Sequence, residues 1–336
     1  MRDFIFSPPF MSHYPPIVAA LVTLIATLLL TLNKDGTIKD IPNERSLHST
    51  PIPRVGGIGI MLGILAGWAF LLTDLRVWLV LPMLGLFALS IVDDKQGLSA
   101  KSRFIAHVVA AIVVLLGLGL AWYWWLPVLL YIVWMTNLYN FMDGSDGLAG
   151  GMAMFGFTVY GFAALQHGGA DAEVFAMLCF AIGAAALGFL YHNFYPATVF
   201  MGDAGSIPLG FLAASLGAWG WQQNFWPLWF PLLVFSPFVM DATATLLLRL
   251  RRGEKLAQAH RSHYYQRLIL SGFGHQATAI LEYVLMALVG MSALWGITQT
   301  LATQANLLAF WAAIYLALSM WIDKRWRNFC AAQEQK

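Results

Sequence analysis

The sequence predicts an all-α polytopic membrane protein, a bundle of about ten or eleven transmembrane helices. Of its 336 residues, 59% are hydrophobic and 11% are charged, whereas an ordinary soluble domain has roughly 45–50% and about 25%. The mean hydropathy of +0.68, with 14 Trp and 23 Phe, exceeds what one soluble core of this length could bury. Lipid is therefore the expected solvent of most helices. The composition also excludes disorder and a disulfide scaffold.

Eleven segments are apolar enough and nearly long enough to cross a bilayer core, which takes roughly 20 helical residues. They run approximately over 16–32, 56–73, 77–92, 104–121, 123–140, 149–166, 174–191, 206–220, 227–248, 277–299 and 305–322. A count of ten is the alternative, because the third segment is short and the fourth and fifth almost adjoin. The first span is expected to be retained, since no A-x-A-like cleavage site precedes it. We interpret 1–336 as one integral-membrane domain whose largest loop is 249–275.

The charges predict how the chain is oriented. Assigning the loops alternately to the two sides puts 17 of the 19 basic residues on one side and only Arg2 and Arg76 on the other. The positive-inside rule makes the first side cytoplasmic, with the N-terminus outside and the C-terminus inside. Tryptophans are expected at the outer interface, namely Trp122, Trp124, Trp125, Trp219, Trp221, Trp226 and Trp229. The net charge of +2 gives no reason to expect a nucleic-acid partner, and two cysteines cannot form a zinc cluster.

Most carboxylates fall on the cytoplasmic side, in short loops. The first of these loops, 92–103, contains the adjacent pair Asp93 and Asp94, followed by Lys101 and Arg103. Two neighbouring carboxylates repel each other, which raises one pKa or recruits a cation. This loop is therefore a candidate for chemistry.

Two further loops add oxygen ligands. In 137–151, Asn137, Asn140 and Asp143 recur every three residues and share one helix face. Asp146 follows, among four glycines that let the backbone approach an anion closely. In 200–206 a lone carboxylate, Asp203, is flanked by glycines. Hard oxygen ligands with phosphate nearby suit Mg²⁺, which usually takes only one or two protein carboxylates.

Basic groups come from two more cytoplasmic loops. The loop 249–275 contains two imidazoles and two guanidiniums close together, His260, Arg261, His263 and Arg267. Such a group could grip a diphosphate, since Arg binds phosphate through two hydrogen bonds. In 45–57, Arg45, His48 and Arg54 precede the pair Gly56–Gly57, which opens a helix. A helix N-terminus of this kind is a favourable place for an anion.

The remaining polar residues within or near spans are interpreted as structural or left open. His13, His107, His167, His192 and His275 lack a suitable acidic or basic companion in the sequence and are expected to be structural. Asp241 and Glu282 lie within spans and must face the bundle interior. For these two acids, a structural ion pair and a functional role are equally open.

Five loops on one side thus present carboxylates, amides, glycines and cations together. This combination fits a phosphorylated nucleotide arriving from water and a phosphorylated lipid arriving from the membrane. At these residues the sequence resembles the polyprenyl-phosphate N-acetylhexosamine-1-phosphate transferases (glycosyltransferase family 4), most closely the O-antigen-initiating members. The resemblance covers nearly the whole chain. Its most specific string is Asn-x-x-Asn-x-x-Asp-Gly-x-Asp-Gly-Leu-Ala, from Asn137 to Ala149.

The resemblance implies a reaction and its partners. The oxygen of a polyprenyl (undecaprenyl) phosphate would attack the β-phosphorus of a UDP-N-acetylhexosamine, releasing UMP and leaving a polyprenyl-diphospho-sugar. The cofactor implied is Mg²⁺, for which Mn²⁺ could substitute. The implied setting is the bacterial inner membrane, with the active site in the cytoplasm, at the first step of O-antigen or other cell-surface polysaccharide synthesis. The resemblance leaves room for a homodimer.

The resemblance also implies roles, position by position. Asp203 resembles the principal Mg²⁺ ligand and Asn140 the second. Asp93 would deprotonate or orient the lipid phosphate, with Asp94 beside it. The implied catalytic residues are Asp93, Asp94, Asp203 and His263, and the implied substrate-binding residues are Arg54, Lys101, Arg103, Asn137, Asp143, Asp146 and Arg261.

One departure from the family pattern narrows the choice. Relatives often continue the last motif as Arg-x-His-x-His, but Tyr265 stands at the second His position here. This argues against the phospho-muramoyl-pentapeptide transferase branch, which is the alternative within the family and has a His-rich loop. The sugar stays open among N-acetylglucosamine and its 6-deoxy relatives, such as N-acetylfucosamine and N-acetylquinovosamine.

Other classes of protein fit less well. A secondary transporter also needs many spans and buried acids, but it places them near the midplane, whereas these acids lie at helix ends. An intramembrane aspartyl protease would need Gly-x-Gly-Asp, and the first glycine is missing before Asp203. A CDP-alcohol phosphotransferase would need Asp-Gly-x-x-Ala-Arg, a pattern that 143–148 breaks. Release of UMP from UDP-sugars distinguishes the enzyme from a carrier.

Overall fold

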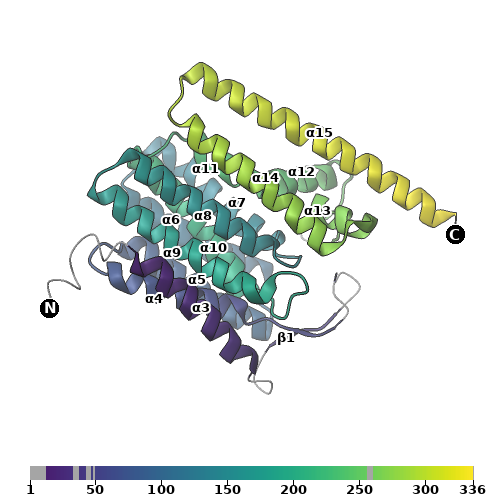
Figure 1. Ribbon diagram of the computed structural model, residues 1–336, viewed down its shortest axis with the longest axis horizontal. Helices are drawn as coiled ribbons and strands as arrows, with labels where there is room; N and C mark the ends of the chain where they lie inside the picture. Colours follow the sequence, from purple (N-terminus) through teal and green to yellow (C-terminus); the bar gives the residue numbers. More distant parts are fainter. Residues whose placement is uncertain (1–12, 33–37, 43–46, 48–49, 256–259, 336) are drawn as a thin grey trace.

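The eleven predicted spans all contain α-helix in the computed structural model, so the chain is an all-α polytopic membrane protein (Figure 1). The structure describes residues 13–32, 38–42, 47, 50–255 and 260–335. Among these residues, seven helical stretches are long and apolar enough to cross a membrane. They are α3 (Tyr14–Leu32), α5 (Val77–Gln96), α6 (Ala100–Leu118), α8 (Leu148–His167), α9 (Ala170–Asn193), the stretch Tyr264–Gly296, which contains α14 (Gly274–Gly296), and α15 (Leu301–Glu334).

The other elements are shorter or less apolar. They are a two-residue antiparallel ladder of β1 (Lys39–Asp40) and β2 (Ile52–Pro53), α4 (Gly56–Trp68), η1 (Ala69–Leu71), η2 (Trp122–Trp124), α7 (Trp125–Phe141), α10 (Asp203–Gln222), α11 (Trp229–Val234), α12 (Ser236–Arg251), α13 (Tyr264–Leu268) and the π-helical η3 (Ile269–Phe273). α6 and α7 are separate helices, which favours eleven segments over ten.

One predicted span is two helices. The segment 227–248 breaks at Phe235, between α11 and α12. Pro237 lies in the first turn of α12. Proline has no backbone N–H and therefore cannot continue the hydrogen bonding of a preceding helix.

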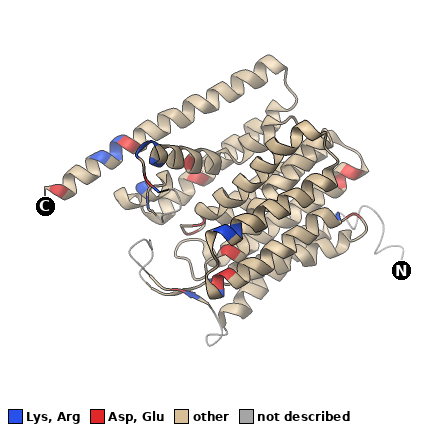
Figure 2. Cartoon of the chain, turned by 180° about the vertical axis from the view of Figure 1, so that it is seen from behind, with Lys and Arg blue, Asp and Glu red and all other residues tan. Residues whose placement is uncertain are grey.

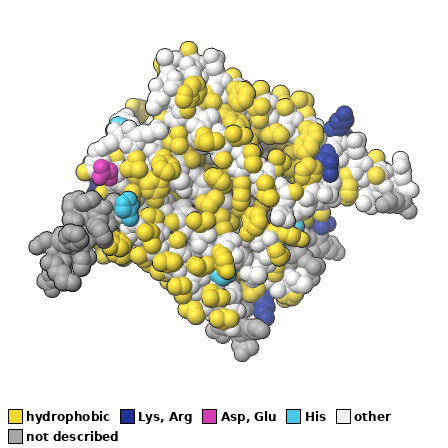
Figure 3. Space-filling view, viewed as in Figure 1, with side chains coloured by type: hydrophobic (Ala, Val, Ile, Leu, Met, Phe, Trp, Pro, Cys, Tyr) yellow, Lys and Arg dark blue, Asp and Glu magenta, His cyan; other side chains and the backbone are white. Residues whose placement is uncertain are grey.

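The surface has exposed apolar side chains along the helices and charged residues near the helix ends, as expected of helices that face lipid. α3 exposes Ile17, Leu21, Ile25 and Leu28 along one stripe, and hydrophobic side chains cover the middle of the face shown in Figure 3. Most charged residues lie at helix ends (Figure 2). The α5–α6, α7–α8 and α9–α10 connections meet at one end of the bundle, which we call the polar end.

Helix α10 occupies the centre of the bundle. Every residue from Ala204 to Gly220 is buried, because α10 packs against α4, α5, α6, α7, α8 and α11. Its sequence is rich in Gly, Ala and Ser, which allow neighbouring backbones to approach closely. A helix enclosed in this way meets little lipid and does not need the hydropathy of an outer span.

The start of α4 is fixed against the segment that leads into α10. The N–H groups of Gly56 and Gly57 donate to the carbonyl oxygens of Phe200 and Met201, at 3.0 and 2.9 Å. A Cβ on Gly57 would overlap the backbone nitrogen of Gly205. The expectation that the Gly56 and Gly57 N–H groups bind an anion is therefore wrong, because both already have partners and backbone fills the space.

The tryptophans divide into two groups. Trp122 is 83% exposed, in keeping with an interfacial position, but Trp219 and Trp226 are buried. The Trp226 indole N–H donates to the Gly217 carbonyl at 3.0 Å, and its ring stacks on Tyr160. For Trp219 and Trp226, the prediction that their rings act as interfacial anchors is wrong, since tertiary packing covers both rings.

The close approach of α4 and α10 predicts a sharp difference between two glycine substitutions. Gly57→Ala should lower the thermal unfolding midpoint in detergent, with a loss of about 1–3 kcal/mol, because the new methyl group collides with backbone that cannot rotate away. Gly85→Ala in α5 is the matched control, since a Cβ there meets nothing within 4 Å. The control should gain about 0.5–1 kcal/mol from the helix preference of alanine. Equal midpoints for the two variants would contradict the packing described.

Candidate functional site

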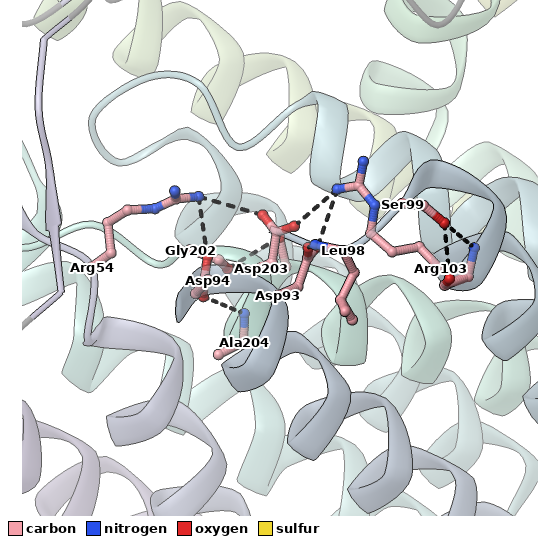
Figure 4. Close-up of polar contacts among 11 residues, drawn as sticks. Arg54, Asp93, Asp94, Leu98, Ser99, Arg103, Gly202, Asp203 and Ala204 are labelled. Atoms are coloured by element: carbon pink, nitrogen blue, oxygen red, sulfur yellow. Dashed lines mark hydrogen bonds and ion pairs between the residues drawn. The ribbon is translucent and has the colours of Figure 1, made fainter. Parts of the chain in front are cut away.

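Asp203, the first residue of α10, lies between two arginines at the polar end (Figure 4). Its Oδ1 is 3.4 Å from Arg54 Nη2, and its Oδ2 is 3.5 Å from Arg103 Nη1. Each arginine also reaches a second carboxylate, Arg54 to Asp94 at 3.4 Å and Arg103 to Asp93 at 3.1 Å. The carboxylates come from α5 and α10, and the guanidiniums from the segment just before α4 and the first turn of α6. The four ion pairs form one chain that runs from Asp93 to Asp94, which we call the carboxylate cluster.

A tight turn between α5 and α6 brings Arg103 back over Asp93. Gly97 ends α5 with φ of 69°, in the left-handed region that glycine occupies without strain. The Leu98 N–H then donates to Asp93 Oδ1. Ser99 caps α6 by accepting from the Ser102 N–H at 3.1 Å. As a result Arg103 lies one turn into α6, facing the end of α5.

Asp94 is held against the start of α10. Its Oδ2 accepts the Ala204 N–H at 3.3 Å, and its side chain is only 4% exposed. Gly202 precedes α10 with φ of 69°, and a Cβ there would come within 3.1 Å of Asp94 Oδ2. The N-terminus of α10 favours negative charge nearby, which helps to stabilise two partly buried carboxylates at this point.

The end of α7 and the loop after it add two oxygen-bearing side chains to the cluster. The Asn140 side chain lies close enough to the Asp203 carboxylate to lower the pKa of Asp203. Asp143 lies beside the backbone N–H of Gly202, which favours the charged form of its carboxyl group. Burial raises the pKa of Asp143 well above its usual range; Arg54 opposes this rise, whereas Asp203 and Asp94 add to it. Two residues that the sequence spaced along one helix face therefore both meet the start of α10.

A polar pocket of about 240 Å³ adjoins the cluster. Arg54, Asp143 and Gly202 belong to its wall, so the pocket and the cluster share residues. The other lining residues are Asp40, Leu47, Gly144, Ser145, Asp146, Asn193, Phe200, His260, Gln266 and His275. The pocket thus presents polar groups next to the cluster, which lies at the ends of apolar helices.

His275 connects separate segments of the pocket wall, although the sequence predicts a structural role for it because no acidic or basic companion lies nearby in the chain. Its Nδ1 is 3.1 Å from Ser145 Oγ and 3.7 Å from Asp146 Oδ1. Its Nε2 is 3.2 Å from the Leu47 carbonyl oxygen, and its ring stacks on Tyr195. The predicted lack of a companion is wrong, because distant segments supply Ser145 and Asp146. No local sequence signal indicates them.

The two imidazoles of the largest loop have different environments. His260 lines the pocket, and burial, with His263 and Arg249 nearby, lowers the pKa of His260 to about 4. It therefore offers the pocket a neutral ring at neutral pH. His263 is buried, with Nδ1 3.0 Å from Asp241 Oδ1, and is absent from the described pocket wall.

Asp241 organises the segment that carries His263. Its carboxylate accepts the N–H groups of Tyr264 at 3.0 Å and Tyr265 at 2.9 Å, and the hydroxyl of Thr245 at 3.1 Å. The presence of an acid within a span indicated that Asp241 faces the interior, but the contact with His263 depends on how α12 meets α13.

The remaining predicted residues are spread around the site. Asp146 lies on the pocket wall and accepts the Ala197 N–H at 3.0 Å. Asn137 donates to the Val133 carbonyl, one turn back in its own helix, and is not part of the wall. Lys101 and Arg261 are exposed and have no side-chain partner among the described residues. Arg45 and His48 lie outside the described residues.

The cluster has the donor chemistry of a site for a hard cation. Among the residues that the structure describes, four carboxylates, from Asp93, Asp94, Asp143 and Asp203, share the two guanidiniums of Arg54 and Arg103. Within the described ranges, no three His, Cys, Asp or Glu side chains form a ready-made metal cluster. A hard cation bound here would therefore have to complete its shell with water or phosphate, as Mg²⁺ usually does.

Comparison with known proteins finds a family match over the part of the chain that contains most of the cluster residues. The model of the family described as Glycosyl transferase family 4 matches residues 76–220, from the start of α5 into α10. The chain is 30% identical over 305 residues to the probable undecaprenyl-phosphate N-acetylglucosaminyl 1-phosphate transferase of Bacillus subtilis (strain 168), covering 83% of this chain and 84% of the relative. It is 30% identical to the undecaprenyl-phosphate alpha-N-acetylglucosaminyl 1-phosphate transferase of Yersinia pestis, with 86% and 85% covered. It is 28% identical to the decaprenyl-phosphate N-acetylglucosaminephosphotransferase of Mycobacterium tuberculosis (strain ATCC 25618 / H37Rv), with 82% and 80% covered.

Substitution of His275 should loosen the pocket wall without loosening the bundle. In His275→Ala, the backbone N–H of Ala197, which donates to Asp146, and that of Gly147 should exchange hydrogen faster. The physical reason is that the loops lose the imidazole that joins them. Exchange within α8 and α9 should be unchanged. His192→Ala is the control, because His192 contacts Leu24 in α3 rather than the pocket. Unchanged exchange at both loop amides would show that the wall does not depend on His275.

Proposed function

Because this chain belongs to glycosyl transferase family 4, the polyprenyl-phosphate N-acetylhexosamine-1-phosphate transferases, we propose that it transfers an N-acetylhexosamine 1-phosphate group from a UDP-sugar to a polyprenyl phosphate. The observation that carries this proposal is the junction of the polar pocket with the carboxylate cluster, where Arg54 belongs to both. A nucleotide dissolved in water and a phosphate anchored in the membrane can meet at such a boundary.

The names of the relatives support N-acetylglucosamine as the sugar, and its 6-deoxy relatives fit the same proposal. The product would be the first lipid-linked intermediate of a cell-surface polysaccharide such as O-antigen. The departure at Tyr265 argues against the muramoyl-pentapeptide branch.

The proposed step forms one P–O bond and breaks another. The polyprenyl phosphate oxygen bonds to the β-phosphorus of the UDP-sugar, and the bond from this phosphorus to the oxygen bridging to the α-phosphorus breaks. That oxygen leaves with UMP. A phosphate monoester is already largely ionised at neutral pH, so the part proposed for Asp93 is to fix Arg103, whose remaining N–H groups can hold the lipid phosphate. Arg54 would hold the diphosphate from the pocket side.

Magnesium is part of the proposal. Asp203 and Asn140 would hold the ion, because their side chains already meet and both offer oxygen donors. Mn²⁺ accepts the same donors. When bound, the ion neutralises charge on the diphosphate during transfer. The excess of carboxylates over guanidiniums in the cluster supports this assignment.

The proposed reaction is tested by measuring UMP. Purified protein given Mg²⁺, a UDP-N-acetylhexosamine and undecaprenyl phosphate should release UMP and form a labelled lipid that partitions into organic solvent. Leaving out the lipid should abolish UMP release, since the lipid phosphate is the nucleophile. A panel of UDP-sugars then identifies the donor. Absence of lipid-dependent UMP from every sugar tested would contradict the proposal.

Asp203→Asn tests the metal assignment. The substitution keeps the volume and one oxygen but removes the charge, so transfer should fall by on the order of 10² or more, equivalent to about 2.7 kcal/mol of barrier. The melting temperature should change little. The rival interpretation, a helix cap, is weakened because Gly202 occupies the N-cap position.

Asp171→Asn is the matched control for Asp203→Asn. Asp171 is an exposed acid in the first turn of α9, at the other end of the bundle, so its loss should leave turnover intact. UMP release is followed across a Mg²⁺ titration for both variants. Near-normal turnover of Asp203→Asn at saturating Mg²⁺ would remove Asp203 from the metal site.

We propose that the polar end faces the cytoplasm of a bacterial inner membrane, with the N-terminus outside and the C-terminus inside. The support is the 17 to 2 division of basic residues between the two sides. The described chain does not include 1–12, so the external position of the N-terminus remains a prediction.

Cysteine labelling tests this orientation. In a Cys330→Ser background, where only the buried Cys179 remains, Ala170→Cys should react with an impermeant maleimide added to intact cells. Lys255→Cys should react only after permeabilisation. Both positions are exposed helix-end or loop residues. Ala170 is preferred to Gly169, whose φ of 95° would strain any other residue. The reverse labelling pattern would overturn the orientation.

A further inference from the structure

A hollow of about 470 Å³ lies between η3 and the C-terminal part of α15 and shares no residue with the pocket or the carboxylate cluster. Its lining residues are Ser271, Trp321, Lys324, Arg325, Asn328 and Phe329. The five residues from α15 follow the spacing i, i+3, i+4, i+7 and i+8, so they form one helix face. In the described structure this lining holds two cations and no acid.

The hollow lies at the level expected for lipid headgroups. α15 has 34 residues and is therefore about 51 Å long, whereas about 20 residues suffice to cross the hydrocarbon core. Its first 20 residues, 301–320, contain no charged side chain. Trp321 follows at once, in the position of an interfacial aromatic residue, and α15 continues beyond the bundle (Figure 1). On the other wall, Ser271 lies just before α14 begins its own crossing.

Arg325 is already held in place within the hollow. Its Nε donates to Ser271 Oγ at 3.0 Å and its Nη2 to the Ser271 carbonyl at 2.6 Å. The guanidinium also lies 4.6 Å from the centre of the Phe273 ring. These contacts use only part of its five N–H donors. A fixed guanidinium loses little side-chain freedom on binding an anion.

The acid nearest in sequence does not neutralise this face. Asp323 pairs with the buried Arg267 of α13 at 2.6 Å and is not part of the lining. Lys324 is exposed beside Arg325. If Lys324 and Arg325 served only to orient α15 in the membrane, neither would need to line a hollow, and Arg325 would not need to lie against an aromatic ring.

We propose that this hollow binds the phosphate headgroup of an anionic phospholipid. Arg325 and Lys324 contact the phosphate, the Asn328 amide donates to it, and Trp321 and Phe329 pack on the glycerol and upper acyl chain. Basic pockets between membrane helices are suited to such headgroups. A polyprenyl phosphate has the same terminal chemistry, but the separation of the hollow from the carboxylate cluster favours a bulk phospholipid. The proposal does not depend on the proposed transferase reaction.

Lipid titration of the purified full-length protein tests this site. Phosphatidylglycerol added to protein in neutral detergent should raise the melting temperature in a saturable way, and phosphatidylcholine should not. Lys324→Gln should weaken the apparent Kd for phosphatidylglycerol about fivefold, from the loss of one cation near the lipid surface. Arg327→Gln is the matched control, because Arg327 is exposed on the same helix but does not line the hollow. It should leave the Kd unchanged.

Four outcomes would overturn the proposal. Equal weakening by Lys324→Gln and Arg327→Gln would mean diffuse surface attraction, and equal stabilisation by phosphatidylcholine would mean no headgroup recognition. Lys324-dependent stabilisation by inorganic phosphate alone would indicate a free-phosphate site. Lys324-dependent stabilisation by undecaprenyl phosphate, but not by phosphatidylglycerol, would indicate a site for the substrate lipid. The melting temperature of Lys324→Gln without added lipid should equal that of the parent protein, which separates lipid binding from misfolding.

Discussion

The close approach of α4 to α10 at Gly57 and Gly205 is the constraint on which the site depends. It allows the backbone around Gly57 to pair with the segment before α10, and this pairing brings Arg54 to within reach of Asp203. Burial at the centre of the bundle would otherwise make the carboxylates at the start of α10 costly. Two guanidiniums and the N-terminus of α10 offset that cost. The same glycine contact therefore serves both packing and electrostatics.

The two arginines of the cluster differ in whether they line the polar pocket. Arg54 belongs to the wall of the polar pocket, whereas Arg103 does not, and Asp203 lies between them. Each arginine is fixed by its own second carboxylate, so the two can hold different phosphates without competing for one anchor. A soluble donor and a membrane-bound acceptor need such an arrangement, because they approach a single reacting phosphorus from different solvents.

The sequence predicted the helices more fully than the contacts among them. Each of the eleven segments located by hydropathy contains helix, although 227–248 is two helices. The spacing of Asn137, Asn140 and Asp143 predicted that they share one helix face. In the structure Asn140 lies beside Asp203 and Asp143 beside Gly202, whereas Asn137 bonds within α7. Hydropathy could not show that other helices surround α10. Its Gly, Ala and Ser residues allow close helix packing, which a hydropathy scale does not measure. The contacts of His275 and Asp241 were also beyond sequence patterns, because each depends on segments that are distant in the chain. The functional roles of the site residues remain predictions.

Tyr265 shows how a departure from a family motif can be accommodated by packing. Its side chain is buried, its ring stacks on His263, and its hydroxyl lies 3.4 Å from the Phe141 carbonyl. A Cβ on Gly144 would overlap this hydroxyl. Tyr265 thus fills the space between the His263 segment and the loop that carries Asp143, where an imidazole would be smaller. The phenol thus separates the two loops. Tyr265 does not line the pocket, so groups that do line it, among them Arg54, Asp143 and His260, are the ones that can contact a ligand.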